Sequence, residues 1–408
     1  MVHAAHGAAA LYDRAVPIYL DHAATTPLRA EALEAMLPYL TAEYGNPSSA
    51  HGAGRRARLA LDEARERFAA AIGAQPREIV FAGTGTEATN LAVKGAAWAA
   101  KARGHHLVTS SVEHHATLHA MRYLEKFGFE VTELPVDRYG RVDPEHLAAA
   151  IIDRTTLVSL IWANNEVGTI QPIAELIARI REHKGVLIHL DAVQAAAHLE
   201  LDVRQLGADL VSFSAHKFEG PKGIGALWIR HGTTLLPQTQ GGPQERHRRA
   251  GTENVAGAVG MAVACELNRA ERAETSRRLR RLRDRLREAV LAVPGVELTG
   301  HPRERLPNHL SVVVRDTEGE SVAVALDLDG LCCSTGSACD SGSNEVSHVL
   351  TAMGYPEEEA RGALRFTLGR GTTEEEIERC RAAIPETIER LRAAALVLAE
   401  TLGEGVRT

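Results

Sequence analysis

The sequence has few cysteines and few aromatic residues, and it carries no excess of positive charge. Its 408 residues include 5 cysteines, and an odd number argues against the paired disulfide framework of a secreted protein and favours a reducing compartment. The formal net charge is -7, and aromatic residues make up 4% of the chain. Without a basic field or many stacking platforms, the chain is not expected to bind nucleic acid directly.

Long apolar runs are absent as well. No stretch approaches the roughly 18 uninterrupted apolar residues that a spanning helix needs. The segment 1–13 contains no Lys or Arg, so it lacks the charged start of a secretory signal and the Arg-rich character of a transit peptide. We therefore expect residues 1–18 to form an N-terminal tail of a cytoplasmic protein that is not attached to a membrane.

The composition, 45% hydrophobic and 24% charged, predicts two to three domains with a large core. Between residues 79 and 229, short β-rich runs alternate with helix-length stretches, a pattern that predicts crossover connections and a mainly parallel sheet. The predicted strands are 79–81, 106–110, 130–134, 157–162, 186–190, 209–213 and 224–229. The predicted helices between them are 86–104, 115–128, 143–152 and 173–185.

After about residue 260 the pattern changes to that of a smaller α+β unit. It consists of a long charged helix, two short β runs, a further run LRFTLG and a final helix: 263–292, 296–298, 310–314, 364–369 and 373–402. We therefore predict a large domain over 19–260 and a small domain over 261–408. We also expect the segment up to about residue 25 and a basic helix at 50–72 to pack between the domains. The arginine-rich stretch 277–288 could bind RNA or an acidic partner, but its leucines at helical spacing favour packing on the small domain.

In a parallel sheet the ligand lies beyond the carboxyl ends of the strands, so the polar residues that follow each run are the candidates. Gly85 and Thr86 follow the first run and open a helix, where free N–H groups can hold a phosphate or simply take part in a helix cap. His114 follows the second run. His115 and His119 have the spacing of zinc ligands on a helix, but the Glu of a metalloprotease motif is missing, and no metal site is predicted.

Lys217 follows the sixth run, beside His216 and Ser214, and Asp191 follows the fifth. A lysine held at a strand end beside a desolvating core can act as a Schiff-base amine, although a solvated loop lysine is the simpler alternative. A carboxylate at a neighbouring strand end is what a pyridinium nitrogen needs to stay protonated as part of an electron sink. Together the two residues suggest pyridoxal phosphate.

Cys339 lies in the segment LCCSTGSACDSGS at 331–343. Free cysteines usually pack in cores, so a cysteine in a Gly/Ser-rich segment with little capacity to pack indicates reactive chemistry. A metal cluster built from Cys332, Cys333 and Cys339 remains a minor alternative.

These residues, with several longer motifs, make the chain resemble the cysteine desulfurases, pyridoxal-phosphate enzymes of fold type I in the class V aminotransferase group. The resemblance runs from Tyr19 to about Leu402. Its markers are YLDHAATTP (19–27), YGNPSSAHGAG (44–54), GTEATNLAVKG (85–95), NNEVGTIQPI (164–173), LDAVQ (190–194), SFSAHKFEGPKGIGAL (212–227), RRAGTENV (248–255), STGSACDSGS (334–343) and LRFTLGR (364–370).

The resemblance implies a role for each candidate residue. Lys217 would carry the cofactor, Asp191 would bind the pyridine nitrogen, and His114 would stack on the ring and shuttle protons. Gly85, Thr86, Ser214 and His216 would hold the phosphate, and Gln194 would meet the ring oxygen. Asn165 and Arg365 would lie near the substrate carboxylate. Asn165 would also bind the cofactor. Thr252 would reach the phosphate of the partner subunit, which implies a homodimer.

By the same resemblance, L-cysteine would yield L-alanine and a persulfide on Cys339, and the sulfur would pass to an iron–sulfur scaffold or another acceptor protein. The sequence departs from the family pattern at Glu219, where an apolar residue is common, and at Asp340, whose carboxylate beside Cys339 should raise the thiol pKa and slow thiolate formation. The chain also ends shortly after the last predicted helix, so a tail that docks a scaffold could be shortened.

Two other functions remain open at this stage. A selenocysteine lyase or another class V pyridoxal-phosphate enzyme would not require Cys339. A scaffold that has lost catalysis is the third alternative, but a binding module has no physical need for Lys217, Asp191, His114 and Cys339 together.

Overall fold

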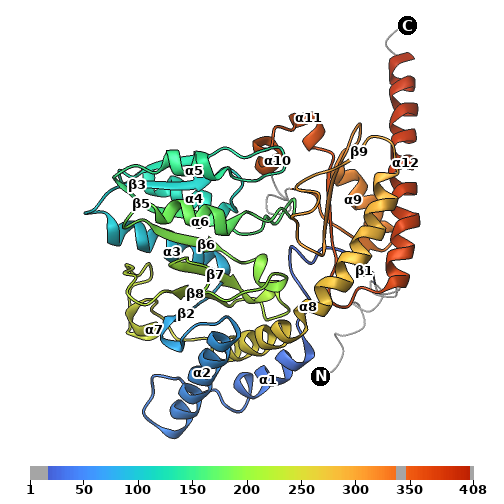
Figure 1. The fold of residues 1–408 in the computed structure, drawn as a ribbon. Coiled ribbons are helices and arrows are strands. Elements are labelled where there is room, and N and C mark those ends of the chain that lie inside the picture. The colour runs from blue at the N-terminus through green and yellow to red at the C-terminus, as the bar shows by residue number, and fades with distance from the viewer. Residues whose placement is uncertain (1–16, 337–345, 405–408) are drawn as a thin grey trace.

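A large α/β domain and a smaller α+β domain lie side by side in the computed structural model, which describes residues 17–336 and 346–404 (Figure 1). Each domain has its own core. Phe68, Phe81 and Phe213 belong to the core of the large domain, whereas Leu310 and Phe366 belong to that of the small domain. The division into a large domain over 19–260 and a small domain over 261–408 stays a prediction.

The large domain is built on a seven-stranded sheet with the order β2-β8-β7-β6-β5-β3-β4. Strand β8 runs antiparallel to both of its neighbours, β2 and β7, and the other pairs are parallel. The prediction of a mainly parallel seven-stranded sheet is confirmed. The strands are β2 (Ile79–Ala82), β3 (His106–Ser110), β4 (Glu130–Leu134), β5 (Thr155–Ile161), β6 (Leu187–Asp191), β7 (Leu210–Ser214) and β8 (Gly225–Ile229).

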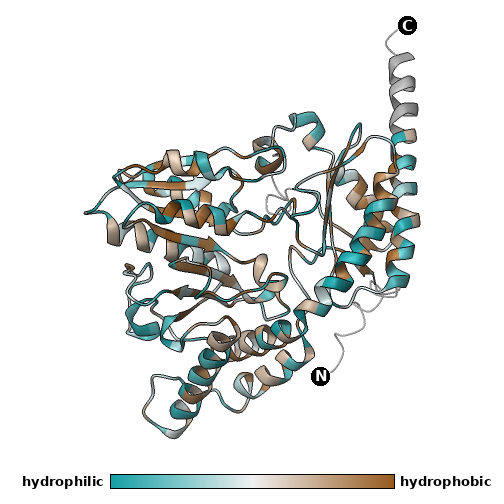
Figure 2. Ribbon diagram, in the orientation of Figure 1, coloured by the Kyte–Doolittle hydropathy of each residue, from teal (hydrophilic) through white to brown (hydrophobic). Residues whose placement is uncertain are grey.

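Helices cover this sheet, and its central strands are buried along their whole length, which explains their nearly continuous apolar runs (Figure 2). The crossover helices are α3 (Gly85–Ala100), α4 (His115–Glu125), α5 (Pro144–Ala150) and α6 (Ile173–Arg181). Two further helices, α1 (Ala30–Leu40) and α2 (Gly52–Ala71), and a short turn, α7 (Gln244–His247), complete the domain. Helix α2 was expected between the domains, but Leu61 and Phe68, at helical spacing, bury its apolar face in the large-domain core instead.

The small domain has an antiparallel sheet of order β12-β10-β9. A short parallel pair of β1 and β11 joins the N-terminal segment to it, and Ile18 and Leu20 lie in its core. The strands are β1 (Ile18–Tyr19), β9 (Val296–Leu298), β10 (His309–Val314), β11 (Leu331–Cys332) and β12 (Ala363–Thr367). The helices are α9 (Gly319–Leu328), α10 (His348–Ala352), α11 (Glu357–Ala360) and α12 (Glu374–Glu404).

One long helix, α8 (Val255–Leu291), runs from the large domain into the small one (Figure 1). The predicted start at residue 263 was wrong because Asn254 caps the helix earlier, its Oδ1 accepting a hydrogen bond from the N–H of Gly257 at 2.8 Å. Leu279, Leu282 and Leu286 lie in the small-domain core, so the packing predicted for the arginine-rich stretch is confirmed. The boundary predicted at residue 260 falls inside this helix.

Candidate active site

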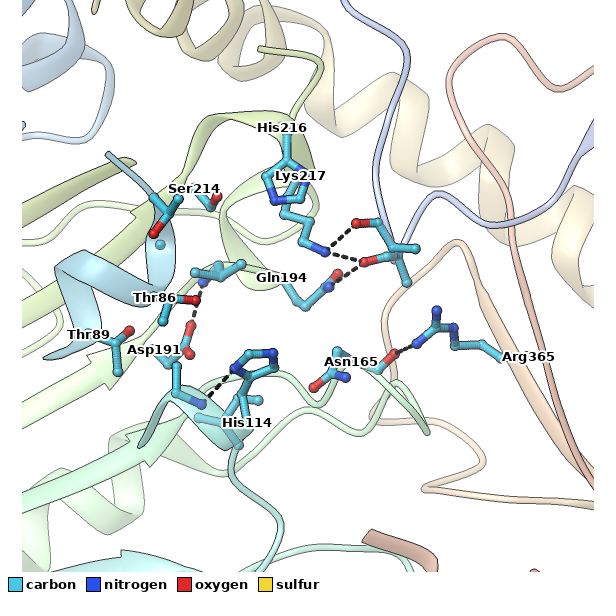
Figure 3. A pocket seen from close by; sticks show the side chains of 17 residues that line it. Thr86, Thr89, His114, Asn165, Asp191, Gln194, Ser214, His216, Lys217 and Arg365 are labelled. Carbon is cyan, nitrogen blue, oxygen red and sulfur yellow. Dashed lines mark hydrogen bonds between the residues drawn. The ribbon is translucent and has the colours of Figure 1, made fainter. Parts of the chain in front are cut away.

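A cavity of about 380 Å³ lies at the carboxyl ends of the central strands, where the topology predicts a ligand (Figure 3). Its lining includes every predicted site residue except Thr252 and Cys339. Those present are Gly85, Thr86, His114, Asn165, Asp191, Gln194, Ser214, His216, Lys217 and Arg365. Thr252 is exposed and lies outside this lining, and Cys339 lies outside the described residues.

Lys217 enters the cavity from the short turn after β7. Its Nζ donates hydrogen bonds to the carbonyl oxygens of Ala23 and Ala24, at 2.6 and 2.7 Å. The Nε2 of Gln194 donates to the same Ala23 oxygen at 2.9 Å. The N-terminal motif therefore folds across the cavity and supplies the carbonyl groups that hold the amine in place.

Asp191 is the last residue of β6, and its side chain is almost fully buried. Its Oδ1 accepts a hydrogen bond from the N–H of Val193 at 2.9 Å. Burial raises the pKa of Asp191 to about 6, although the same backbone hydrogen bond and the charge of Lys217 favour the ionised form. A cationic N–H in the cavity would stabilise the ionised form of this desolvated carboxylate. Asp191 therefore suits a protonated ring nitrogen.

His114 is the N-cap of α4, and its Nδ1 accepts a hydrogen bond from the N–H of Ala116 at 3.0 Å. Because Nδ1 accepts, the neutral ring carries its proton on Nε2. Burial lowers the pKa of His114 to about 4, and Lys217 lowers it further. The ring in the cavity wall is therefore neutral near pH 7.

One end of the cavity is formed by the turn from β2 into α3, where the sequence predicts a phosphate site. Thr84 caps the helix, its Oγ1 accepting from the N–H of Glu87 at 3.0 Å. Gly85 is required here because a Cβ atom would lie 2.9 Å from the Cβ of Ser214. The Oγ1 of Thr89 lines the same end, is buried, and has no hydrogen-bond partner among the described residues. Free N–H groups, a hydroxyl and the helix dipole together favour an anion.

The opposite end of the cavity is built across the two domains. Arg365, on β12, is buried, and its Nη1 donates to the carbonyl oxygen of Asn165 at 2.9 Å. Its Nη2 pairs with the carboxylate of Asp21 at 2.9 Å. Its Nε has no partner among the described residues. The guanidinium therefore has donor capacity left for a substrate carboxylate.

These features fit pyridoxal phosphate in one orientation. The anion-binding turn and the unpartnered Thr89 hydroxyl suit the phosphate, Asp191 suits the ring nitrogen, and Lys217 supplies the amine. Arg365 lies on the other side of the cavity from Ser214 and Thr86 (Figure 3), which leaves room for an amino acid between the ring and the guanidinium.

Glu113, which the sequence did not single out, is a fully buried acid beside this site. Its Oε1 accepts from the hydroxyl of Ser110 at 2.6 Å and from the N–H of Ile161 at 2.8 Å. Burial raises the pKa of Glu113 to about 8, and the nearby Asp191 adds to the rise. The neutral acid thus ties the turn that carries His114 to the end of β5.

Sequence reasoning missed Asp21 and Thr89 as well as Glu113. Asp21 was present in the quoted motif YLDHAATTP, but only folding brings it to Arg365, 344 residues away. Glu219, a departure from the family pattern, has a left-handed backbone with φ of 64°. Its carboxylate accepts a hydrogen bond from the Nε of Arg370 at 2.9 Å, and the pair links the turn that carries Lys217 to the small domain.

Two further features bear on the function. Within residues 17–336 and 346–404, no group of three or more His, Cys, Asp or Glu side chains could hold a metal ion. Over the same ranges, every helix is too short or too polar to cross a lipid bilayer.

Comparison with known proteins agrees with this geometry. Residues 18–380 match the family model of the class-V aminotransferases. The chain is 51% identical over 375 residues to a protein of Methanosarcina thermophila named cysteine desulfurase IscS, with 92% of this chain and 93% of the relative covered. A protein of the same name from Dictyoglomus turgidum is 50% identical, with 92% and 95% covered.

Solved structures give the same result. A NifS-like protein superimposes with a TM-score of 0.87 at 37% identity, covering 91% of this chain and 99% of that one. A cysteine desulfurase from Thermococcus onnurineus superimposes with a TM-score of 0.81 at 27% identity, covering 91% and 95%. The chain therefore belongs to the class-V aminotransferases, a pyridoxal-phosphate-dependent family, and within them to the cysteine desulfurases.

Proposed function

We propose that this protein removes sulfur from L-cysteine, giving L-alanine and a persulfide on Cys339. The observation that carries the proposal is the single cavity in which Lys217, Asp191 and His114 meet, with Arg365 at its far end. The reaction balances: the Cβ–S bond of the substrate breaks as an S–S bond to Cys339 forms. The electron pair of the broken bond stays on the substrate carbon, which takes up a proton to give L-alanine, and the transferred sulfur is oxidised to the persulfide level. No external oxidant is needed for this half of the cycle.

Pyridoxal phosphate, when bound, supplies the electron sink that stabilises negative charge at the α-carbon of the substrate. Asp191, a buried carboxylate, would keep the ring nitrogen protonated. The Lys217 amine would take the α-proton of the substrate and return a proton later. The neutral His114 in the cavity wall would lie against the ring, and its Nε2–H would donate or relay a proton.

The carboxylate of L-cysteine binds at the domain junction. The planar guanidinium of Arg365 can hold a carboxylate through two parallel hydrogen bonds, and the amide of Asn165 lies beside it in the cavity lining. Gln194 lies near Lys217, in the position proposed for contact with the ring oxygen.

The later steps involve residues beyond this cavity. Cys339 attacks the substrate sulfur and then passes it to an acceptor protein, for which an iron–sulfur scaffold is the proposed candidate. Thr252, which is exposed in a single chain, is proposed to contact the cofactor phosphate of a partner subunit in a homodimer. A cytoplasmic location is part of the same proposal.

The decisive experiment measures sulfide and alanine release from L-cysteine with a thiol reductant, together with the cofactor absorption spectrum. We expect the wild-type protein to make both products in equal amounts. Cys339→Ala should keep the yellow cofactor and lose both products. Cys332→Ala is the matched control, since this half-buried thiol lies on β11, and it should behave as wild type.

Other outcomes select the alternatives. If Cys339→Ala binds the cofactor and converts the substrate as well as wild type does, the persulfide route is wrong, and a selenocysteine lyase or a related class V activity becomes the better assignment. A colourless wild-type protein that neither binds the cofactor nor turns over would instead favour a scaffold function.

A further inference from the structure

The loop from Gln244 to Thr252 has an unusual backbone. Three successive residues other than glycine, Glu245, Arg246 and His247, have positive φ values of 45°, 56° and 64°. Such residues rarely adopt this conformation unless the surroundings impose it. The loop must therefore be fixed by strong contacts.

Glu245 provides these contacts. Its carboxylate is buried and forms two hydrogen bonds with the guanidinium of Arg65, both 2.7 Å long. One of the same oxygens also accepts from the N–H of Phe81 at 3.0 Å. The loop is thus attached to β2, the strand that leads into the phosphate turn.

Arg249, further along the loop, reaches that turn directly. Its Nε donates to the Oε1 of Glu87 at 2.8 Å, and its Nη2 lies 3.4 Å from the Oε2. Glu87 belongs to the turn itself, since its Oε2 accepts from the N–H of Gly83 at 2.7 Å. The ion pair therefore lies against the first turn of α3, beside Gly85 and Thr86.

The position of Glu87 creates an electrostatic problem for the cofactor. Its carboxylate accepts a hydrogen bond from Gly83 and lies in the first turn of α3, the turn proposed to hold a phosphate dianion, and like charges so placed repel. Among the described lining residues, Lys217 and Arg365 are the only lysine or arginine. The Nζ of Lys217 donates to the carbonyl oxygens of Ala23 and Ala24, and Arg365 is at the other end of the cavity, so neither neutralises Glu87.

We propose that Arg249 is a positioning residue for the cofactor: by pairing with Glu87, it cancels the negative charge beside the phosphate turn and so sets the affinity for the phosphate group. The inference rests on the proposed function only in requiring that pyridoxal phosphate binds in this cavity. It does not depend on which substrate is used.

The test titrates pyridoxal phosphate, and separately pyridoxal without the phosphate, into the cofactor-depleted full chain and follows absorbance. Arg249→Gln leaves Glu87 uncompensated and should weaken pyridoxal phosphate binding about ten-fold or more, with little effect on pyridoxal. The double variant Glu87→Gln/Arg249→Gln should recover near-wild-type affinity. Arg248→Gln is the matched control, because Arg248 contacts the carbonyl oxygen of Arg77 rather than a carboxylate.

A purely structural role for the pair gives a different pattern. The double variant would then bind as weakly as Arg249→Gln, and pyridoxal and pyridoxal phosphate would be affected alike; that result overturns the proposal. If Arg249→Gln fails to fold, the single variant Glu87→Gln decides between the two roles. We expect this variant to bind pyridoxal phosphate at least as tightly as wild type. Weaker binding would indicate a structural contact and overturn the proposal. Because the readout is cofactor affinity, a chain that binds the cofactor without desulfurating L-cysteine would refute the proposed function and leave this test intact.

Discussion

The two ends of the cavity are built in different ways. The proposed cofactor end takes its side chains from successive strand ends of one sheet, with Asp191 as the last residue of β6 and Lys217 after β7. The substrate end takes Arg365 from the small domain, Asn165 from the large domain and Asp21 from the N-terminal segment. The first end is positioned by neighbouring strands of one sheet, whereas the second depends on how the two domains and the N-terminal segment pack together. Substitutions at the two ends should therefore have different kinetic signatures.

The largest effect is expected at the cofactor end, from Asp191→Asn. The amide can still accept a hydrogen bond from the N–H of Val193, but it cannot keep the ring nitrogen protonated. We expect kcat to fall by about 10³-fold, with a shifted cofactor spectrum and a smaller change in KM. Asp209→Asn is a suitable control, because Asp209 is a buried carboxylate at the amino end of β7 that pairs with Arg181. It should lower stability and spare the spectrum; equal kcat losses in the two variants would argue against a role at the ring.

The second prediction concerns the substrate end. Arg365→Lys keeps the charge but removes the planar fork that binds a carboxylate. A charge-assisted contact of about 1.5–3 kcal/mol would then be lost, which corresponds to a rise in the KM for L-cysteine of roughly 10- to 100-fold. Steady-state kinetics should show the change mainly in KM, and cofactor titration should give the wild-type dissociation constant. A loss confined to kcat would place Arg365 nearer the reacting atoms than proposed here.

How well the sequence predicted each end follows from this difference. The strand ends could be read directly, because apolar runs, their order and the parallel topology place Asp191 and Lys217 at one sheet edge. The roles of His114, Gln194 and Arg365 came from the family resemblance, since nothing in their local patterns is specific. Asp21, Glu113 and the pair of Glu87 with Arg249 were missed, because their meaning lies in contacts between segments far apart in the chain. Thr89 was missed because only the fold shows that its hydroxyl is buried without a partner among the described residues. Residue spacing carries no information about such contacts.

A third prediction tests whether the interior of the sheet beside Asp191 excludes protons. His189 lies on β6 two residues before Asp191, fully buried between the hydroxyls of Ser159 and Ser212 at 2.8 and 2.7 Å. Burial lowers its pKa to about 3 from 6.5. Below pH 6.5, His189 therefore binds a proton in the unfolded chain but not in the folded chain. The free energy of unfolding falls as the pH drops from 6.5 towards 3.

Replacing His189 should remove this dependence. At pH 5, protonation of His189 in the unfolded chain alone lowers the free energy of unfolding of the wild type by about 2 kcal/mol. Between pH 7 and pH 5, the free energy of unfolding of His189→Gln should therefore fall by that much less than that of wild type, whatever its value at pH 7. Urea unfolding at the two pH values measures the difference. His146→Gln, on the exposed face of α5, is the control and should keep the wild-type dependence. An unchanged dependence in His189→Gln would mean that the centre of the sheet admits the proton.

The smallest effect is expected from Asp21→Asn. This substitution distinguishes two possible roles of Asp21: compensating the charge of Arg365 and orienting its guanidinium toward the substrate. Arg365 is buried, and among the described residues its Nε has no partner. Removing the Asp21 carboxylate leaves this buried charge less compensated. We therefore expect the Tm of the ligand-free variant to fall by a few °C. The carboxylate of a bound amino acid then restores what Asp21 supplied. L-Alanine should consequently raise the Tm of Asp21→Asn more than that of wild type, and the KM for L-cysteine should fall a few-fold rather than rise. A higher KM would show instead that Asp21 aims the guanidinium at the substrate, and that the domain junction relies on this ion pair for geometry more than for charge.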